Sequence, residues 1–310
     1  MKTFLVTGGC GFIGSHLSEA LVRAGHGVRI LDDLSSGSRS NIPPGADFIE
    51  GDVADAAAVR RVLQGVDGCF HLAAIASVER GVQDWLGTHR VNLTGTITVF
   101  DEVRRLGRAG AIPVVYASSA AVYGDCDILP ITETTARRPL SAYGADKYGC
   151  ELHALVATHT HAIPTLGLRF FNVYGPRQDP RSPYSGVISI FCERLRRNAS
   201  VDIFGDGGQT RDFIYVGDVV AALLAGMAQP PPGGRVLNVC TGVETSVRDL
   251  ASVIADLCQT TPQVREQPPR AGEVRHSVGS RTLAEAVLAL SPPTPLRVGL
   301  GNVLTWMQAG

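Results

Sequence analysis

Two residues of the segment SAYGADKYG, Tyr143 and Lys147, have types and a spacing suited to acid-base chemistry. The helical pattern continues through Leu152 and Leu155, so the two side chains would lie one turn apart on one face. A free tyrosine has a pKa of about 10, and a nearby ammonium group favours the phenolate form. Tyr143 could then act as a general base. The pair also fits an ordinary solvent-exposed helix face.

A second candidate is the serine pair in the segment VYASSAAVYGD, residues 115–125. An apolar strand runs into Ser118 and Ser119, and Ala120 and Ala121 follow them. No acid or histidine stands directly beside the hydroxyls. The strand therefore brings hydroxyl groups without charge to the end of a sheet.

The segment TGGCGFIGSH places Gly8, Gly11 and Gly14 between a predicted strand at 4–7 and a helical pattern at 15–24. With a second strand at 28–31, they form a βαβ unit. Glycines at such a turn let the backbone approach a pyrophosphate, and the helix N-terminus favours the negative charge. Glycines also occur in turns that bind no ligand.

Asp32 ends the second strand of this unit. A carboxylate there can accept hydrogen bonds from an adenosine ribose, and its charge would repel the 2′-phosphate of NADP. The sequence therefore predicts NAD as the cofactor. The alternative interpretation is a carboxylate that merely ends a strand at a turn.

These residues need a scaffold that brings strand ends together. Further strands are predicted at 47–50, 68–72, 114–117 and 165–170, with helical patterns between most of them. Strands alternating with helices indicate an α/β fold with a Rossmann-type doubly wound parallel sheet. After Gly175 the sequence becomes rich in proline, serine and charged residues. We predict an NAD-binding domain at 1–175, to which 211–240 returns, and a smaller substrate-binding region formed by 176–210 and 241–310.

Composition excludes several classes of protein. The chain has 310 residues, 45% hydrophobic, and a formal net charge of -1, so neither nucleic acid nor a membrane is an expected partner. The longest apolar run, 219–228, is shorter than the about 20 residues that cross a bilayer. The opening MKTFLVTGG lacks the apolar core of a signal peptide. Scattered cysteines and histidines without ligand spacing predict a cytoplasmic protein with no metal site.

Together these motifs resemble the extended short-chain dehydrogenase/reductases. The resemblance rests on TGGCGFIG, the strand ending at Asp32, GDV at 51–53, HLAA at 71–74, Asn92, the serine pair and the Tyr143/Lys147 pair. It covers nearly the whole chain, because four further segments are similar to the nucleotide-sugar branch: RFFNVYGPRQ, SPYSGVISIF, GDGGQTRDFIYVGDV and RAGEVRHS. Within that branch the chain most resembles the NAD-dependent UDP-hexose 4-epimerases, particularly those acting on N-acetylated sugars.

The resemblance implies a role for each matching position. Ser119, Tyr143 and Lys147 would be catalytic, and Ser118 would be structural or a neighbour of the cofactor. NAD would contact Tyr143 and Lys147 together with Gly8, Gly11, Phe12, Ile13, Gly14, Asp32, Asp33, Ser35, Ser36, Asp52, Val53, Leu72, Ala73, Ala74 and Asn92. The UDP-sugar would contact Ser119, Tyr143, Asn172, Val187, Ile203, Phe204, Arg211, Arg270, Glu273 and Ser277. Ala76 departs from the pattern, since many 4-epimerases carry a lysine there against the cofactor.

The implied reaction is a reversible oxidation at C4′ of the sugar. Tyr143 would take the proton of the 4′-hydroxyl while Ser119 hydrogen-bonds the same oxygen, and NAD would take the hydride. The transient 4-keto sugar would rotate in the site while Arg211 and Arg270 hold the diphosphate. The hydride would then return to the opposite face of the sugar.

Position 277 is expected to select the substrate. In the epimerases that the chain resembles, the residue four positions after the acid of the RxGD/E motif borders the C2 substituent of the sugar, and counting from Glu273 gives Ser277. A tyrosine there excludes an N-acetyl group, and a small residue admits it. We therefore predict activity on UDP-GlcNAc and UDP-GalNAc, with UDP-Glc and UDP-Gal accepted less well or comparably. The alternative is that Ser277 is a neutral loop residue.

Other functions fit parts of the sequence. Related dehydratases and decarboxylases carry acids after the catalytic hydroxyl, so Ala120 and Ala121 argue against elimination. A uronate or pentose epimerase, a sugar-nucleotide reductase and a non-catalytic NAD-binding sensor stay open, although retention of both Tyr143 and Lys147 argues against the sensor. The resemblance also implies a homodimer in which 91–106 and 143–156 form a four-helix bundle; the same amphipathic stretches could equally cover the sheet.

Overall fold

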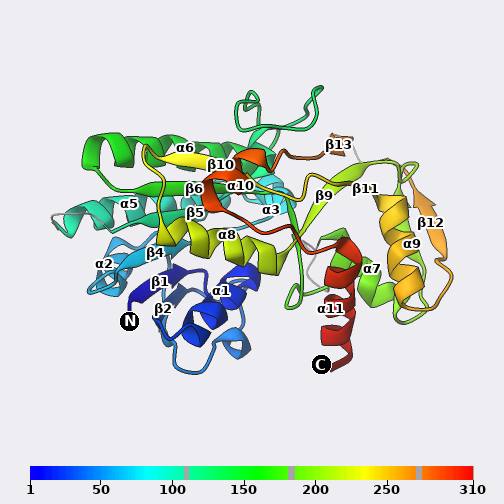
Figure 1. The fold of residues 1–310 in the computed structure, drawn as a ribbon, viewed down its shortest axis with the longest axis horizontal. Coiled ribbons are helices and arrows are strands. Elements are labelled where there is room, and N and C mark those ends of the chain that lie inside the picture. The colour runs from blue at the N-terminus through cyan, green and yellow to red at the C-terminus, as the bar shows by residue number, and fades with distance from the viewer. Residues whose placement is uncertain (108–111, 181–185, 270–273, 310) are drawn as a thin grey trace.

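A seven-stranded sheet forms the larger part of the molecule in the computed structural model, which describes residues 1–107, 112–180, 186–269 and 274–309 (Figure 1). All neighbouring strands in this sheet are parallel. Their spatial order is β10 (Arg235–Val239), β6 (Thr165–Phe170), β5 (Val114–Ser119), β4 (Gly68–His71), β1 (Thr3–Thr7), β2 (Gly27–Asp32) and β3 (Asp47–Glu50). The predicted α/β class and doubly wound parallel sheet are confirmed.

Helices cover both faces of this sheet because its strands are apolar on both sides. In β1, Phe4 and Val6 enter one buried cluster and Leu5 enters the other. The first face carries α1 (Phe12–Arg23), α8 (Val216–Ala228) and α10 (Thr282–Leu288). The second face carries α2 (Ala56–Val62), α5 (Gly95–Arg105) and α6 (Ala142–His161).

Short helical segments connect these elements. Two short α-helices, α3 (Val78–Gln83) and α4 (Trp85–His89), lead into the π-helical turn η2 (Arg90–Thr94), which continues into α5. The 3₁₀ segments are η1 (Arg39–Asn41) and η3 (Ala120–Val122). No helix among the described residues is both long and apolar enough to span a membrane.

A smaller part of the molecule stands beside the large sheet (Figure 1). Its described residues form two small sheets and three helices: β7 (Asn172–Tyr174), α7 (Val187–Leu195), β8 (Val201–Phe204), β9 (Thr210–Tyr215), β11 (Glu244–Ser246), α9 (Val247–Leu257), β12 (Val264–Gln267), β13 (His276–Ser277) and α11 (Leu296–Ala309). Ile188, Leu250 and Leu300, one from each helix, meet in its own buried cluster.

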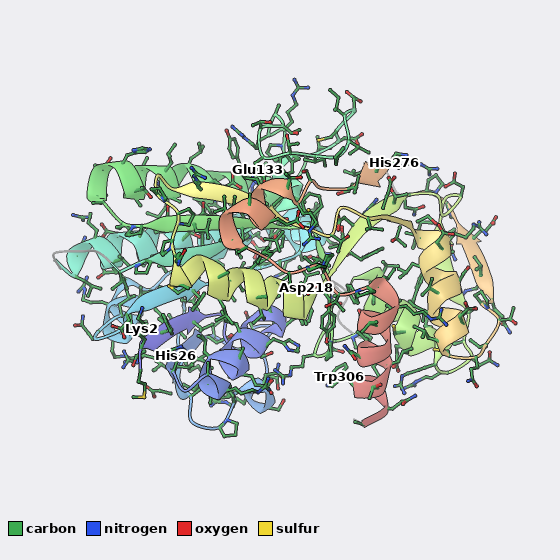
Figure 2. The ribbon with its side chains drawn as sticks, viewed as in Figure 1. Lys2, His26, Glu133, Asp218, His276 and Trp306 are labelled. Carbon is green, nitrogen blue, oxygen red and sulfur yellow. The ribbon has the colours of Figure 1, made fainter. Side chains whose placement is uncertain are left out.

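The chain passes between the two parts more often than the sequence indicates. Within the predicted returning segment 211–240, α8 packs on the large sheet and β10 is one of its strands. The residues of β9 belong instead to a small sheet. Helix α10, from the predicted smaller region, packs on the first face of the large sheet. Asp218, labelled in Figure 2, lies at the start of α8 and accepts hydrogen bonds from the backbone N and the Oγ1 of Thr294, at 2.9 and 3.0 Å.

Candidate active site

The carboxyl edge of the large sheet collects most of the predicted site residues. The order of the strands reverses between β1 and β4, and in a doubly wound sheet ligands bind at such a switch point. Gly8 follows β1, Leu72 follows β4, and Asp32 and Ser119 end β2 and β5. Positions far apart in the sequence therefore meet because parallel strands end on the same side.

The glycine turn after β1 has the form that a pyrophosphate requires. Gly8 has φ of +70°, and a Cβ there would lie 2.7 Å from the backbone N of Ala73. At Gly14 a Cβ would lie 2.1 Å from the carbonyl oxygen of Gly8, so these two glycines let the backbone pack closely. A Cβ at Gly11 would meet only that same oxygen, at 3.3 Å. Helix α1 starts at Phe12 with no side-chain cap and no acid in its first turn, so its N-terminus suits an anion.

Asp32 is fixed between the glycine turn and the loop after β2. Its Oδ2 accepts from the backbone N of Cys10 at 2.9 Å, and its Oδ1 accepts from that of Leu34 at 2.8 Å. Burial raises the pKa of the Asp32 carboxyl, and the two N–H groups act in the opposite direction. In the exposed loop that follows, Asp33 accepts from the backbone N and the Oγ of Ser35, and Ser36 is also exposed.

The other predicted NAD contacts surround this turn. Phe12 and Ile13 open α1 and are half-buried, and Val53 is buried after β3. Asp52 accepts a hydrogen bond from Nη2 of Arg90 at 2.6 Å. The positions therefore come from the ends of β1, β2 and β3, in the arrangement that a dinucleotide site needs.

The segment after β4 is anchored at two points. Thr7 Oγ1 accepts from the backbone N of Leu72 and of Ala73, both at 3.2 Å. Two residues further on, the backbone N of Ile75 donates to Oδ1 of Asn92 at 2.8 Å, and Asn92 Nδ2 donates to the carbonyl oxygen of Ile75 at 3.2 Å. The predicted contacts Leu72, Ala73 and Ala74 thus lie on a backbone held in place by buried side chains.

Tyr143 and Lys147 lie where α6 begins, beside the end of β5. Ser141 caps this helix by accepting from the backbone N of Gly144. Lys147 is 3% exposed, and its Nζ lies 6.0 Å from the centre of the Tyr143 ring and donates to the carbonyl oxygen of Ala117 at 2.9 Å. Ser119 is half-buried, and its Oγ accepts from the backbone N of Ala121 at 3.1 Å. The arrangement therefore brings a phenol, an ammonium group and a hydroxyl to one end of the sheet.

The adjacent Ser118 belongs to a buried polar network. Its Oγ donates to Oε1 of Glu151 at 2.5 Å, and both carboxylate oxygens of Glu151 accept from Arg169, at 2.8 and 2.7 Å. Arg169 also donates to the hydroxyl of Tyr123 at 2.6 Å. Burial alone would lower the pKa of Arg169, but the contacts with Glu151 and Tyr123 raise it above its usual value. The sequence reasoning missed this network, although Glu151 stands one helical turn after Lys147.

Three of the predicted sugar-nucleotide contacts share a face of the smaller part. Ser277 of β13 is paired with Arg211 of β9, and Asn172 of β7 is paired with Phe213 of β9. Paired residues in a parallel ladder project to the same side, as do residues two apart in one strand. Asn172, Arg211 and Ser277 therefore lie on one face of this sheet. Arg211 Nη1 donates to the carbonyl oxygen of Thr210 at 2.7 Å.

The remaining predicted contacts divide among three situations. Val187 is the first residue of α7 and is half-buried. Ile203 is fully buried in the core of the smaller part, so its side chain faces that core, whereas Phe204 is half-buried at the end of β8. Arg270 and Glu273 lie outside the described residues.

The described residues contain no cluster of His, Cys, Asp and Glu that could hold a metal ion. Seven cysteines are free.

Comparison with known proteins gives one family and several close structures. The family model described as "NAD dependent epimerase/dehydratase family" matches residues 4–240. A UDP-glucose 4-epimerase of Mycolicibacterium smegmatis is 37% identical over 99% of each chain. The crystal structure of a Thermotoga maritima UDP-glucose 4-epimerase with UDP-glucose has a TM-score of 0.94, with 34% identity and 99% of both chains covered. A UDP-N-acetylglucosamine 4-epimerase of Methanobrevibacter ruminantium has a TM-score of 0.93 and 32% identity, covering 99% of this chain and 98% of that one.

Proposed function

The chain belongs to the NAD dependent epimerase/dehydratase family, and we propose that it inverts C4′ of a UDP-sugar. NAD is its cofactor, as this family membership indicates. The observation that carries the proposal is the meeting of Tyr143, Lys147 and Ser119 at the sheet edge that also holds the glycine turn. A base and a hydroxyl beside a dinucleotide site are what reversible oxidation of an alcohol requires.

Bound NAD would supply the group that takes a hydride from the sugar and gives it back. The residues of the chain would orient it: the N-terminus of α1 would face the pyrophosphate, and Asp32 would face the adenosine ribose. Residues 72–74 would lie along the cofactor. Glycine at position 8 supports this arrangement, because a Cβ there would collide with the backbone of Ala73, and without it the turn presents only its backbone to a ligand.

Proton transfer would fall to Tyr143. Its phenolate would take the proton of the 4′-hydroxyl and return it after the keto sugar has rotated in the site. Lys147, buried and 6.0 Å from the ring centre, would stabilise the negative charge. Ser119 would hydrogen-bond the same sugar oxygen, and the neutral Ala120 and Ala121 beside it would leave no acid to drive elimination.

The substrate would be UDP-GlcNAc or UDP-GalNAc, with UDP-Glc and UDP-Gal also accepted. Support comes from the shared face of Asn172, Arg211 and Ser277. A guanidinium beside a small hydroxyl residue suits a diphosphate next to a sugar that carries an acetamido group. Serine at position 277 would leave the volume that a bulkier side chain would fill.

The active form would be a homodimer. Helix α6 buries Cys150, Ala154 and Ala157 against the sheet and exposes Leu152, Leu155 and Val156 on its other side, by 50%, 43% and 53%. An exposed apolar stripe on a long helix fits a helix-bundle contact with a second copy.

The test incubates the purified protein and NAD with each of UDP-GlcNAc, UDP-GalNAc, UDP-Glc and UDP-Gal, and identifies the products by NMR. We expect each N-acetylated sugar to yield the other, without a change in nicotinamide absorbance that scales with substrate. A change that does scale with substrate would indicate a reductase or dehydrogenase. If none of the four sugars is converted, the proposal is wrong.

A further inference from the structure

A buried chain of hydrogen bonds runs beneath the proposed NAD site. Thr7 Oγ1 lies 2.8 Å from Nδ1 of His71, and Nε2 of His71 lies 2.9 Å from Oγ1 of Thr96. Thr96 Oγ1 donates to the carbonyl oxygen of Asn92 at 2.6 Å. These four residues are between 0% and 3% exposed, so water cannot replace a lost partner. None of the proposed catalytic steps uses His71.

The directions of these hydrogen bonds follow from the two ends of the chain. Thr7 Oγ1 accepts from the backbone N of Ala73 and shares the N–H of Leu72 with the Thr7 carbonyl oxygen, so its acceptor side faces this segment and its proton points to His71 Nδ1. A carbonyl oxygen only accepts, so Thr96 gives its proton to Asn92. Thr96 Oγ1 must then accept from His71 Nε2.

Only one form of the imidazole satisfies both ends. It is the neutral tautomer with hydrogen on Nε2 and a lone pair on Nδ1. An added proton on Nδ1 would face the hydroxyl of Thr7, which already accepts two N–H groups. Burial lowers the pKa of His71 to about 3, and the charge of Lys147 acts in the same direction. Of the neighbouring titratable groups, Cys150 faces the chain through its Sγ, 3.2 Å from Thr96 Oγ1.

This chain joins the two anchors of the segment that follows β4. Thr7 holds Leu72 and Ala73 at one end, and the side chain of Asn92 holds Ile75 at the other. His71 stands between Thr7 and Thr96, and Thr96 fixes the backbone of Asn92 inside the π-helical turn η2. Any change in the length or direction of the link at His71 would shift one anchor relative to the other.

We propose that His71 is a positioning residue: as a neutral imidazole with hydrogen on Nε2, it fixes the 72–75 segment and Asn92 against the glycine turn and thereby sets the affinity for NAD. The inference rests on the proposed placement of NAD along residues 72–74. His71 itself is buried behind that segment and would touch neither NAD nor substrate.

Two substitutions divide the link into its halves. His71→Asn keeps an acceptor near the position of Nδ1 and loses the donor to Thr96, whereas His71→Gln keeps a donor near the position of Nε2 and loses the acceptor for Thr7. Each leaves buried polar groups unpaired, so we expect the NAD Kd to rise by roughly 5- to 30-fold in both variants. The affinity for UDP should not change, because the residues proposed to bind UDP lie in the smaller part of the molecule. His153→Gln, at an exposed position of α6, is the matched control and should leave both affinities unchanged.

A second pair of variants tests the same link away from the histidine. Thr96→Ser retains the hydroxyl and should keep the native NAD Kd, whereas Thr96→Val has a similar size, lacks the hydroxyl and should raise it. This pair also decides the matter if the His71 variants do not fold. Equal weakening of NAD and UDP binding would indicate general damage to the fold and would overturn the proposal, as would an unchanged NAD Kd in Thr96→Val.

The tautomer can be measured on the unaltered protein. In ¹⁵N NMR of histidine-labelled protein, the resonances of His71, assigned by their loss in His71→Gln, should show hydrogen on Nε2 only. They should not titrate between about pH 5 and 8, where an ordinary histidine does. Hydrogen on Nδ1, or an ordinary titration, would refute the assignment. None of these measurements uses sugar turnover, so their outcome is separate from the proposed epimerase activity.

Discussion

The two serines that end β5 have the same type and different surroundings. Ser118 is 1% exposed and donates to the buried carboxylate of Glu151. Ser119 is half-buried, accepts from the backbone N of Ala121 and can give its proton to a substrate oxygen. The alternation of side chains along a strand accounts for the difference, because consecutive residues face opposite sides of the sheet. This geometry supports Ser119 as the proposed catalytic hydroxyl.

At the same scale, Tyr143→Phe should reduce turnover by roughly 10² to 10⁴, the range for loss of a general base. The ring remains, so binding of NAD and of UDP should be unchanged in calorimetry. Ser119→Ala should lose less, because water can partly replace a hydroxyl. Tyr148→Phe, on the same helix, is the control and should retain full activity. Turnover near the native level in Tyr143→Phe would remove this residue from the mechanism.

Substrate choice is also a property of a single residue in the proposal. Ser277→Tyr should abolish turnover of UDP-GlcNAc and UDP-GalNAc and spare UDP-Glc and UDP-Gal. The reason is that a bulky side chain in a closed site rejects a larger substrate, whereas an unfilled pocket costs only about 1 to 3 kcal/mol. Product NMR with both substrate pairs provides the measurement. If both pairs decline equally, or neither declines, Ser277 does not select the substrate.

At the scale of elements, α6 sets the position of the end of β5. Lys147 and Glu151, one helical turn apart, hold consecutive residues of the strand: Nζ of Lys147 donates to the carbonyl oxygen of Ala117, and Glu151 accepts from Ser118. Glu151 is in turn bound to Arg169 of β6, with both side chains almost fully buried. The helix and two strands are therefore fixed together immediately before Ser119.

Glu151→Gln should reveal how much the buried pair of Glu151 and Arg169 contributes to the stability of the protein. It leaves the guanidinium of Arg169 buried without its counter-charge, and removal of one partner of a buried pair costs roughly 3 to 5 kcal/mol. The free energy of unfolding, measured by urea titration, should fall accordingly. The control is Glu266→Gln, because Glu266 and Arg248 form an exposed pair and its loss should change stability little. Similar stabilities for the two variants would show that the buried pair does not stabilise the contact between α6, β5 and β6.

At the scale of the whole molecule, the apolar side of α6 carries a prediction about assembly. Leu155→Glu combined with Val156→Glu should convert the proposed dimer into a monomer, because two charges would lie in an apolar contact between helices. Sedimentation would measure the mass. Val298→Glu, at an exposed apolar residue of α11, should leave the dimer intact. A native protein that sediments as a monomer would contradict the proposed assembly.

Much of this molecule could be predicted from local patterns in the sequence. The strands β3 and β6 have the predicted bounds, and the glycine turn lies between β1 and α1 as expected. The fold class and the family follow from the same patterns. These features are local, since the periodicity of apolar residues and the positions of glycine record which face of an element is buried. A strand at the centre of a parallel sheet is apolar on both faces wherever its partners lie in the sequence.

The polar interior was decided by the tertiary structure alone. The sequence does not indicate that Glu151 pairs with Arg169 or that His71 links Thr7 to Thr96. Nor does it indicate that β9, within the predicted returning segment, belongs to a small sheet. A charged or polar residue looks the same in a sequence whether water or a distant side chain satisfies it, and its burial is tolerable only when that partner is in place. The packing of strands and helices supplies those partners, so it also determines which serine is buried, which tautomer His71 adopts and where the proposed catalytic groups meet.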